Sequence, residues 1–215
     1  MFYAVIIALI LFFTWVYFQF FVKPQFYDPK QFFINVFGEN VAEIRDEAVA
    51  VGSLPTLDIL REREMWTGSA NVLNFINKVY SVGPGWVSSW ESKTNQWLNF
   101  PLMVDGRLFQ QNAQQCPLTA KLLLQHREKI NVAGFSLLEP NAKIPTHTDT
   151  TGIEFGSLAY HLGLEIPNDN CTLTVDGMTE KQQYGKQIVF DSTYPHSAAN
   201  NSDRQRIILY IDFRV

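Results

Sequence analysis

The chain has 215 residues, of which 47% are apolar and 14% aromatic, and its formal net charge at pH 7 is −4. This length and apolar content suit one globular domain with a sizeable core, and the aromatic content argues against a disordered chain. No basic block occurs, which argues against nucleic acid as a partner. Two cysteines, Cys116 and Cys171, are too few for a disulfide framework and lack metal-ligand spacing, so we expect small, partly buried hydrophobic residues there.

The first predicted element is the uncharged apolar run of residues 1–22, "MFYAVIIALILFFTWVYFQFFV". Its length matches a helix that crosses a hydrocarbon layer of about 30 Å. It lacks the basic start and small-residue cleavage site of a signal peptide, and it has almost no polar face. We therefore predict a single transmembrane anchor. Lys23 and Lys30 follow the run and nothing basic precedes it, so the positive-inside rule favours a cytoplasmic position for the rest of the chain.

Residues 23–130 are predicted to form a linker and a helical, supporting part of the catalytic domain. A Pro-containing linker comes first, over residues 23–32. Apolar residues at helical spacing predict helices in the second half of 33–51, over 69–80, and over 116–130, where Pro117 suits the first turn. Residues 81–109 mix Gly, Pro and Trp without a clear period, so we expect loops and short strands.

The sequence changes character at residue 131, after which short strand-like runs alternate with turn-rich segments. The runs are residues 131–140, 155–167, 171–177, 186–196 and 204–215, and the turn-rich segments are 140–143, 167–170, 176–185 and 200–203. Runs with this spacing predict a β-barrel or sandwich with the helices outside it. The core domain is therefore predicted to span residues 131–215.

A His-x-Asp pattern, His147 and Asp149, stands within this core. In an extended segment residues i and i+2 point to the same side, so both side chains can face one ion. His196 follows at the end of a strand-like run. Two histidines and one carboxylate form the facial triad of non-haem Fe(II) oxygenases. On the pattern alone, His147 capping a turn beside a solvated Asp149 remains an alternative.

Arg206 begins the run "RIILYIDF", which is apolar at both odd and even positions, so its side chain is expected to point partly into the protein. A buried guanidinium is costly unless a carboxylate meets it. No acidic partner is obvious on the neighbouring runs, and a dicarboxylate co-substrate would supply a bidentate one. The alternative is an arginine at the rim, paired with Asp212 or with solvent.

Three stretches carry a family resemblance: "FSLLEPNAKIPTHTD", "AYHLGLEIP" and "IVFDSTYPHSAANNSDRQRIILYIDF". They resemble the aspartyl/asparaginyl β-hydroxylase family of Fe(II)/2-oxoglutarate dioxygenases, including the bacterial lipid A hydroxylases within it. The similarity is strong over residues 131–213 and weaker back to about residue 45. The ordered set H-T-D, H-L-G-L, F-D-x-x-x-x-H and R-x-I-L makes it specific.

The resemblance implies a mainly β fold, a double-stranded β-helix of the jelly-roll, cupin-like type with flanking helices. It implies that His147, Asp149 and His196 bind iron and that Arg206 holds the distal carboxylate of 2-oxoglutarate. Ser136 and His161 match positions that assist 2-oxoglutarate binding; the alternatives are a strand-facing serine and a core histidine bonded to backbone. No catalytic residue is expected beyond the metal ligands.

The chain departs from the family pattern at two positions. The animal β-hydroxylase has Gly where this chain has Asp149, whereas the lipid A hydroxylases have Asp. Both groups have an Arg two residues before the H-L-G-L histidine, where this chain has Ala159. One contact to co-substrate or substrate is therefore missing or supplied from elsewhere.

The expected activity is hydroxylation of an unactivated C–H bond by a membrane-anchored enzyme that uses Fe(II), 2-oxoglutarate and O₂. The substrate is either an Asp or Asn side chain of a protein or an acyl chain of a membrane lipid. The alternative from another class is a non-catalytic jelly-roll module that binds a ligand at the membrane.

Overall fold

The computed structural model describes residues 23–57, 83–88, 96–149, 156–167 and 170–215, together with Ile6, Ile7, Ile10, Phe12 and Phe13. The predicted helix over 69–80 lies outside the described residues. The predicted anchor, residues 1–22, lies mostly outside them as well, and it stays a prediction. Among the residues that the structure does describe, no helix combines the length and the apolar character that a membrane crossing requires.

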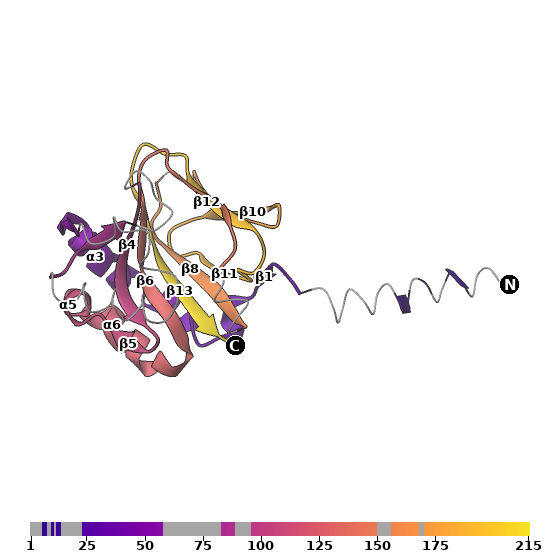
Figure 1. The fold of residues 1–215 in the computed structure, drawn as a ribbon, viewed down its shortest axis with the longest axis horizontal. Coiled ribbons are helices and arrows are strands. Elements are labelled where there is room, and N and C mark those ends of the chain that lie inside the picture. The colour runs from indigo at the N-terminus through magenta and orange to yellow at the C-terminus, as the bar shows by residue number, and fades with distance from the viewer. Residues whose placement is uncertain are drawn as a thin grey trace.

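The described part of the chain is mainly β, as expected, and its strands form two sheets (Figure 1). The larger sheet has the order β1-β11-β8-β13-β6-β4-β3-β2, with β5 paired to β4, and the smaller has the order β10-β9-β12-β7. The bounds of the larger sheet are β1 Phe26–Tyr27, β2 Thr56–Leu57, β3 Trp86–Ser88, β4 Trp97–Val104, β5 Arg107–Leu108, β6 Ile130–Leu138, β8 Ser157–Glu165, β11 Gln187–Phe190 and β13 Arg206–Arg214. Those of the smaller are β7 Lys143–His147, β9 Cys171–Val175, β10 Met178–Gln182 and β12 His196–Asn200.

From β6 onward the chain passes back and forth between the two sheets. β6, β8, β11 and β13 belong to the larger sheet, and β7, β9, β10 and β12 belong to the smaller one. Eight strands shared in this way between two antiparallel sheets make a jelly roll. The predicted barrel or sandwich is confirmed at this level.

Strand β13 shows how the larger sheet is covered on both faces. Ile207, Leu209 and Ile211 belong to the main apolar core, together with Ile44 of the helical layer. Arg206, Ile208 and Tyr210 point to the other face and line a cavity between the sheets. Side chains of a strand alternate between faces, so the apolar residues at both parities follow from burial on both sides.

The helices pack on the outer face of the larger sheet (Figure 1). They are η1 Pro29–Gln31, α2 Asn35–Glu39, α3 Val41–Ala50, η2 Val51–Ser53, α5 Gln110–Ala113, α6 Pro117–Gln125 and η3 Arg127–Lys129. The carboxylate of Glu47 in α3 accepts hydrogen bonds from the backbone N–H groups of Leu118 and Thr119, at 2.7 and 2.9 Å. It thereby satisfies two N–H groups of the first turn of α6, which have no partner within the helix.

Strands β10, β4 and β1 were not expected where they occur. The turn-rich prediction for residues 176–185 is wrong over β10, an edge strand with a mostly polar sequence that gives no apolar alternation. β4 is eight residues long, although residues 81–109 predicted only short strands. β1 lies inside the predicted linker and pairs with β11 at the edge of the larger sheet.

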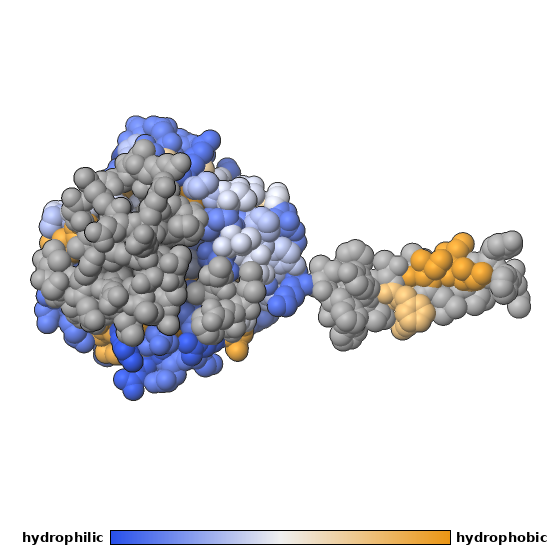
Figure 2. All heavy atoms as spheres, viewed as in Figure 1, coloured by the Kyte–Doolittle hydropathy of each residue, from blue (hydrophilic) through white to orange (hydrophobic). Residues whose placement is uncertain are grey.

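The segment that follows residue 22 is fastened to the body by side-chain and backbone contacts. The backbone N–H of Asp191 donates to the carbonyl of Gln25 at 3.0 Å, and the Tyr194 hydroxyl donates to the carbonyl of Lys23 at 2.9 Å. Residues 191–195 form the turn before His196. Where the body is visible in Figure 2 its described surface is mostly hydrophilic, whereas the described residues of the N-terminal run are hydrophobic.

Candidate metal and co-substrate site

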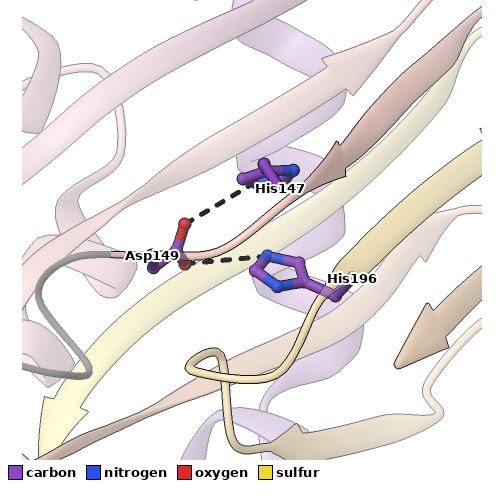
Figure 3. Close-up of side chains that lie close together, drawn as sticks. All are labelled: His147, Asp149 and His196. Atoms are coloured by element: carbon purple, nitrogen blue, oxygen red, sulfur yellow. Dashed lines mark ion pairs between the residues drawn. The ribbon is translucent and has the colours of Figure 1, made fainter. Parts of the chain in front are cut away.

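The three predicted metal ligands come together at the ends of β7 and β12, which are paired strands of the smaller sheet (Figure 3). His147 is the last residue of β7 and His196 the first of β12, and the two are direct partners in the antiparallel register. Asp149 lies in the loop after β7, with Oδ1 3.6 Å from Nε2 of His147 and Oδ2 3.8 Å from Nε2 of His196. One donor atom from each residue lies within 4.8 Å of the others, a separation that one ion can bridge.

Backbone carbonyls hold both imidazoles in the tautomer that a metal requires. Nδ1 of His147 lies 2.9 Å from the carbonyl of Pro145, and Nδ1 of His196 lies 3.0 Å from the carbonyl of Tyr194. A carbonyl only accepts, so each Nδ1 carries a hydrogen, and in the neutral ring each Nε2 then keeps its lone pair. Burial lowers the pKa of His196, which favours the neutral ring.

Tyr210 supports the carboxylate of Asp149, a role that the sequence analysis missed. Its hydroxyl donates to Oδ2 of Asp149 at 3.2 Å. Burial, and then the charge of Asp149, raise the pKa of Tyr210 well above its ordinary value, so the phenol remains a donor. Tyr210 lies on β13 four residues after Arg206, and this shared strand face is the signal that points to it.

At the other end of the site Arg206 is fully buried, which excludes the arginine at the rim. Its Nε donates to Oε1 of Gln182 at 2.9 Å, while the two terminal nitrogens have no hydrogen-bond partner among the described residues. Asp212, the alternative partner, accepts instead from Asn131 at 2.7 Å. Burial lowers the pKa of Arg206 to about 10, so the group keeps its charge near neutral pH.

Ser136 and His161, predicted to assist 2-oxoglutarate binding, line the same cavity as Arg206. The Ser136 hydroxyl accepts a hydrogen bond from the indole of Trp97 at 3.1 Å. Nδ1 of His161 lies 3.2 Å from the amide nitrogen of Gln182, so this partner is a side chain and not the backbone group that the alternative for His161 assumed. Burial, and then the Arg206 charge, lower the pKa of His161 well below its ordinary value.

The cavity has a volume of about 210 Å³ and joins the two ends. The described lining residues come from both sheets: Val87, Trp97, Asn99, Pro101, Val132, Ala133, Gly134, Phe135, Ser136, Ile144, His147, Asp149, His161, Leu173, His196, Ser197, Ala198, Arg206, Ile208 and Tyr210. Two imidazoles and one carboxylate suit Fe(II) and leave coordination positions open. An unsatisfied buried guanidinium suits a carboxylate. The residues present therefore fit Fe(II) together with a dicarboxylate co-substrate.

Ala159 lies on the same face of β8 as His161, but it is not among the described residues that line the cavity. It is fully buried and packs in an apolar cluster with Leu173, Val175, Ile188 and Phe190. Arg206 is the only Lys or Arg side chain among the described lining residues. The Arg that the resemblance leads one to expect at position 159 thus has no cationic replacement in this described lining.

Comparisons with known proteins show the family to which the chain belongs. Residues 38–215 match the family described as Aspartyl/Asparaginyl beta-hydroxylase. A Rhizobium tropici protein named ornithine lipid ester-linked acyl 2-hydroxylase is 36% identical over 124 residues, covering 57% of this chain and 43% of the relative. The human aspartate beta-hydroxylase domain-containing protein 2 is 31% identical over 140 residues, 61% of this chain and 37% of the relative.

These alignments span less than half of either relative. Among solved structures, a Burkholderia pseudomallei oxidoreductase of the 2OG-Fe(II) oxygenase family superposes with a TM-score of 0.46 at 17% identity, covering 66% of this chain and 77% of that chain. The family match covers most of the sequence, from the helical layer to the last strand. The chain belongs to the aspartyl/asparaginyl β-hydroxylase family.

Proposed function

We propose that this protein is an Fe(II)- and 2-oxoglutarate-dependent dioxygenase that hydroxylates an unactivated C–H bond. One observation carries the proposal: a single cavity has a ready set of iron ligands at one end and a fully buried, unsatisfied guanidinium at the other. Such a guanidinium is costly in the free protein unless an anion meets it. A co-substrate that reaches from the metal to Arg206 accounts for both ends.

The roles of the residues follow from their donor atoms. Nε2 of His147, Nε2 of His196 and a carboxylate oxygen of Asp149 hold the iron, and Tyr210 orients that carboxylate. Bound iron would couple decarboxylation of 2-oxoglutarate by O₂ to hydroxylation of the substrate. Arg206 binds the distal carboxylate of 2-oxoglutarate, and Ser136 and His161, which line the same cavity, assist this binding. Apolar walls keep bulk water from the reacting atoms.

An acyl chain of a membrane lipid is the substrate that the cavity wall favours. Along the inner face of β6, Ser136 lies near the Arg206 end, Gly134 pairs with Tyr210 beside the metal ligands, and Val132 lies beyond. Pro101 pairs with Gly134, so the wall past the metal is apolar. Among the described residues that line this part of the cavity there is no Lys or Arg side chain to recognise the carboxylate of an aspartyl side chain, whereas a hydrocarbon needs none.

The named relatives support both substrate classes. The Rhizobium tropici protein is named for acyl hydroxylation of a lipid, and the human protein is named for an aspartate beta-hydroxylase domain. Purified full-length protein is therefore given Fe(II), 2-oxoglutarate and either lipid vesicles or Asp- and Asn-containing peptides. We expect oxygen-dependent succinate formation and a one-oxygen mass gain in the acyl chain. Oxygen on the peptide alone would assign a protein substrate, and no turnover with either would favour the non-catalytic binding module.

Residues 1–22 are proposed as a single-pass anchor that holds the body on the cytoplasmic side, where an acyl substrate is met in the plane of the membrane. The support is the uncharged run itself, with Lys23 and Lys30 after it. A variant that lacks residues 1–22 is expected to be released into the supernatant and to keep decarboxylating 2-oxoglutarate. If the truncated protein sediments with membranes after a high-salt wash, the single-anchor proposal is wrong.

A further inference from the structure

Gln182 joins the two groups that face the proposed co-substrate, although it does not itself line the cavity. It is buried on β10, accepts from Nε of Arg206 at 2.9 Å through Oε1, and places Nε2 3.2 Å from Nδ1 of His161. Arg206 and His161 lie on different strands, β13 and β8. One amide on the smaller sheet thus bridges two residues of the larger one.

The chemistry of arginine fixes which way this amide points. A guanidinium N–H only donates, so the Gln182 atom that faces Arg206 must be the carbonyl oxygen. The atom that faces His161 is then the NH₂ group, which only donates. Nδ1 of His161 must therefore be the acceptor, and in the neutral ring the hydrogen sits on Nε2.

The same contacts leave three sets of N–H groups for a ligand. With Nε held by Gln182, the two terminal nitrogens of Arg206 keep all their hydrogens and have no partner among the described residues. Nε2–H of His161 is the third donor, on a ring that lines the cavity. Position 159 is alanine, and Arg206 is the one Lys or Arg side chain in the described lining, so the positive charge of this lining sits on a group that Gln182 contacts.

We propose that Gln182 is the positioning residue of the co-substrate site: it fixes His161 as an Nε2–H donor and aims the terminal nitrogens of Arg206 at the carboxylates. The proposal rests on the proposed function for the identity of the anion, which is 2-oxoglutarate. The contacts that carry it do not depend on that identity. Gln182 acts through two other residues and does not itself touch the co-substrate.

Gln182→Glu tests the proposal with almost no change in shape. A carboxylate has no hydrogen to donate, so it accepts from both Arg206 and Nδ1–H of His161, and it adds an anion beside the guanidinium. Gln183→Glu is the matched control, because Gln183 is the next residue, is exposed, and receives the same charge outside the cavity. Both variants are compared with the unaltered full-length protein.

The first measurement is a long-range ¹H–¹⁵N spectrum of the imidazoles in metal-free, ¹⁵N-histidine-labelled protein. The chain has four histidines, and His161→Asn identifies the signals of His161 by their loss. We expect the Nε2–H tautomer in the unaltered protein and in Gln183→Glu. In Gln182→Glu we expect the hydrogen to move to Nδ1 or both nitrogens to be protonated. The same tautomer in Gln182→Glu and Gln183→Glu would overturn the proposal.

The second measurement is the KM for 2-oxoglutarate against kcat at saturating co-substrate. Gln182→Glu is expected to raise KM by about tenfold to a hundredfold with kcat within about threefold, the range typical of residues that orient ligands. Gln183→Glu is expected to change neither. Equal KM values in the two variants would refute the positioning role. Absence of turnover in the unaltered protein would instead refute the proposed function, while the tautomer would still be readable.

Discussion

The two ends of the cavity differ in how complete they are without a ligand. At the end with the proposed metal ligands, here called the metal end, the protein itself holds all three side chains: backbone carbonyls contact both imidazoles, and Tyr210 donates to the Asp149 carboxylate. At the buried end, Arg206 is fully enclosed, with two nitrogens that have no partner among the described residues. The metal end is thus prepared in the free protein, whereas the buried end carries a cost that only an anion removes.

The largest effect is expected from variants that remove a proposed metal ligand. His147→Ala or His196→Ala removes one of three ligands, so iron should be lost and succinate formation should fall below detection. Iron content is measured by elemental analysis beside turnover. His126→Ala is the control, because His126 packs on Phe33 in the helical layer and should leave iron and turnover unchanged. Full activity in a His147 or His196 variant would remove that residue from the site.

Replacing Arg206 at the buried end should weaken 2-oxoglutarate binding but raise the stability of the ligand-free protein. Arg206→Met removes the guanidinium that meets the carboxylate, which should weaken 2-oxoglutarate binding by about 2–5 kcal/mol. The same change removes an unpaired buried charge, so the free energy of unfolding of the ligand-free protein should rise by about 1–4 kcal/mol. Calorimetric binding and urea unfolding measure the two quantities. A destabilised variant with an unchanged KM would contradict both expectations.

A smaller effect should separate metal retention from co-substrate binding. Tyr210→Phe deletes only the hydroxyl that donates to Asp149, and such supporting bonds typically contribute about tenfold to a hundredfold to metal affinity. Competition with a chelator reports the iron affinity, and the KM for 2-oxoglutarate should stay close to that of the unaltered protein. A changed KM for 2-oxoglutarate with an unchanged iron affinity would show that Tyr210 acts on co-substrate binding and not on metal retention.

The smallest effect concerns acid stability at the buried end. Burial holds the pKa of His161 well below 6.5, so below pH 6.5 the unfolded chain binds a proton that the folded chain refuses. The stability from the neutral ring is therefore present above pH 6.5 and is lost as pH falls, at a slope that approaches about 1.4 kcal/mol per pH unit. Urea unfolding at pH 7.5 and 5.5 should show a smaller loss for His161→Asn. Parallel losses would place His161 in contact with solvent.

The metal end was largely predictable from sequence, because two of its ligands share one extended segment and the third follows a strand-like run. Arg206 was predictable as well, since apolar residues at both parities of its strand indicated burial on both faces. The helices in the second half of 33–51 and over 116–130 were also predictable, because their apolar residues repeat at helical spacing, although the second helix ends at Gln125.

Gln182 was not predictable, because it lies in a polar edge strand that the turn-rich composition of residues 176–185 concealed. Its two partners are 21 and 24 residues away in sequence. Only the antiparallel pairing of β10 with β9 and the closure of the two sheets bring the three side chains together. Contacts of this kind depend on register between strands, and local composition does not encode register.

The fastening of residues 23–27 has a mechanical consequence. The chain next to the apolar run is hydrogen-bonded to the turn that leads directly into His196, through Lys23 and Gln25. A force applied to residues 23–25 would therefore be transmitted through two hydrogen bonds to the turn that precedes His196, a proposed iron ligand.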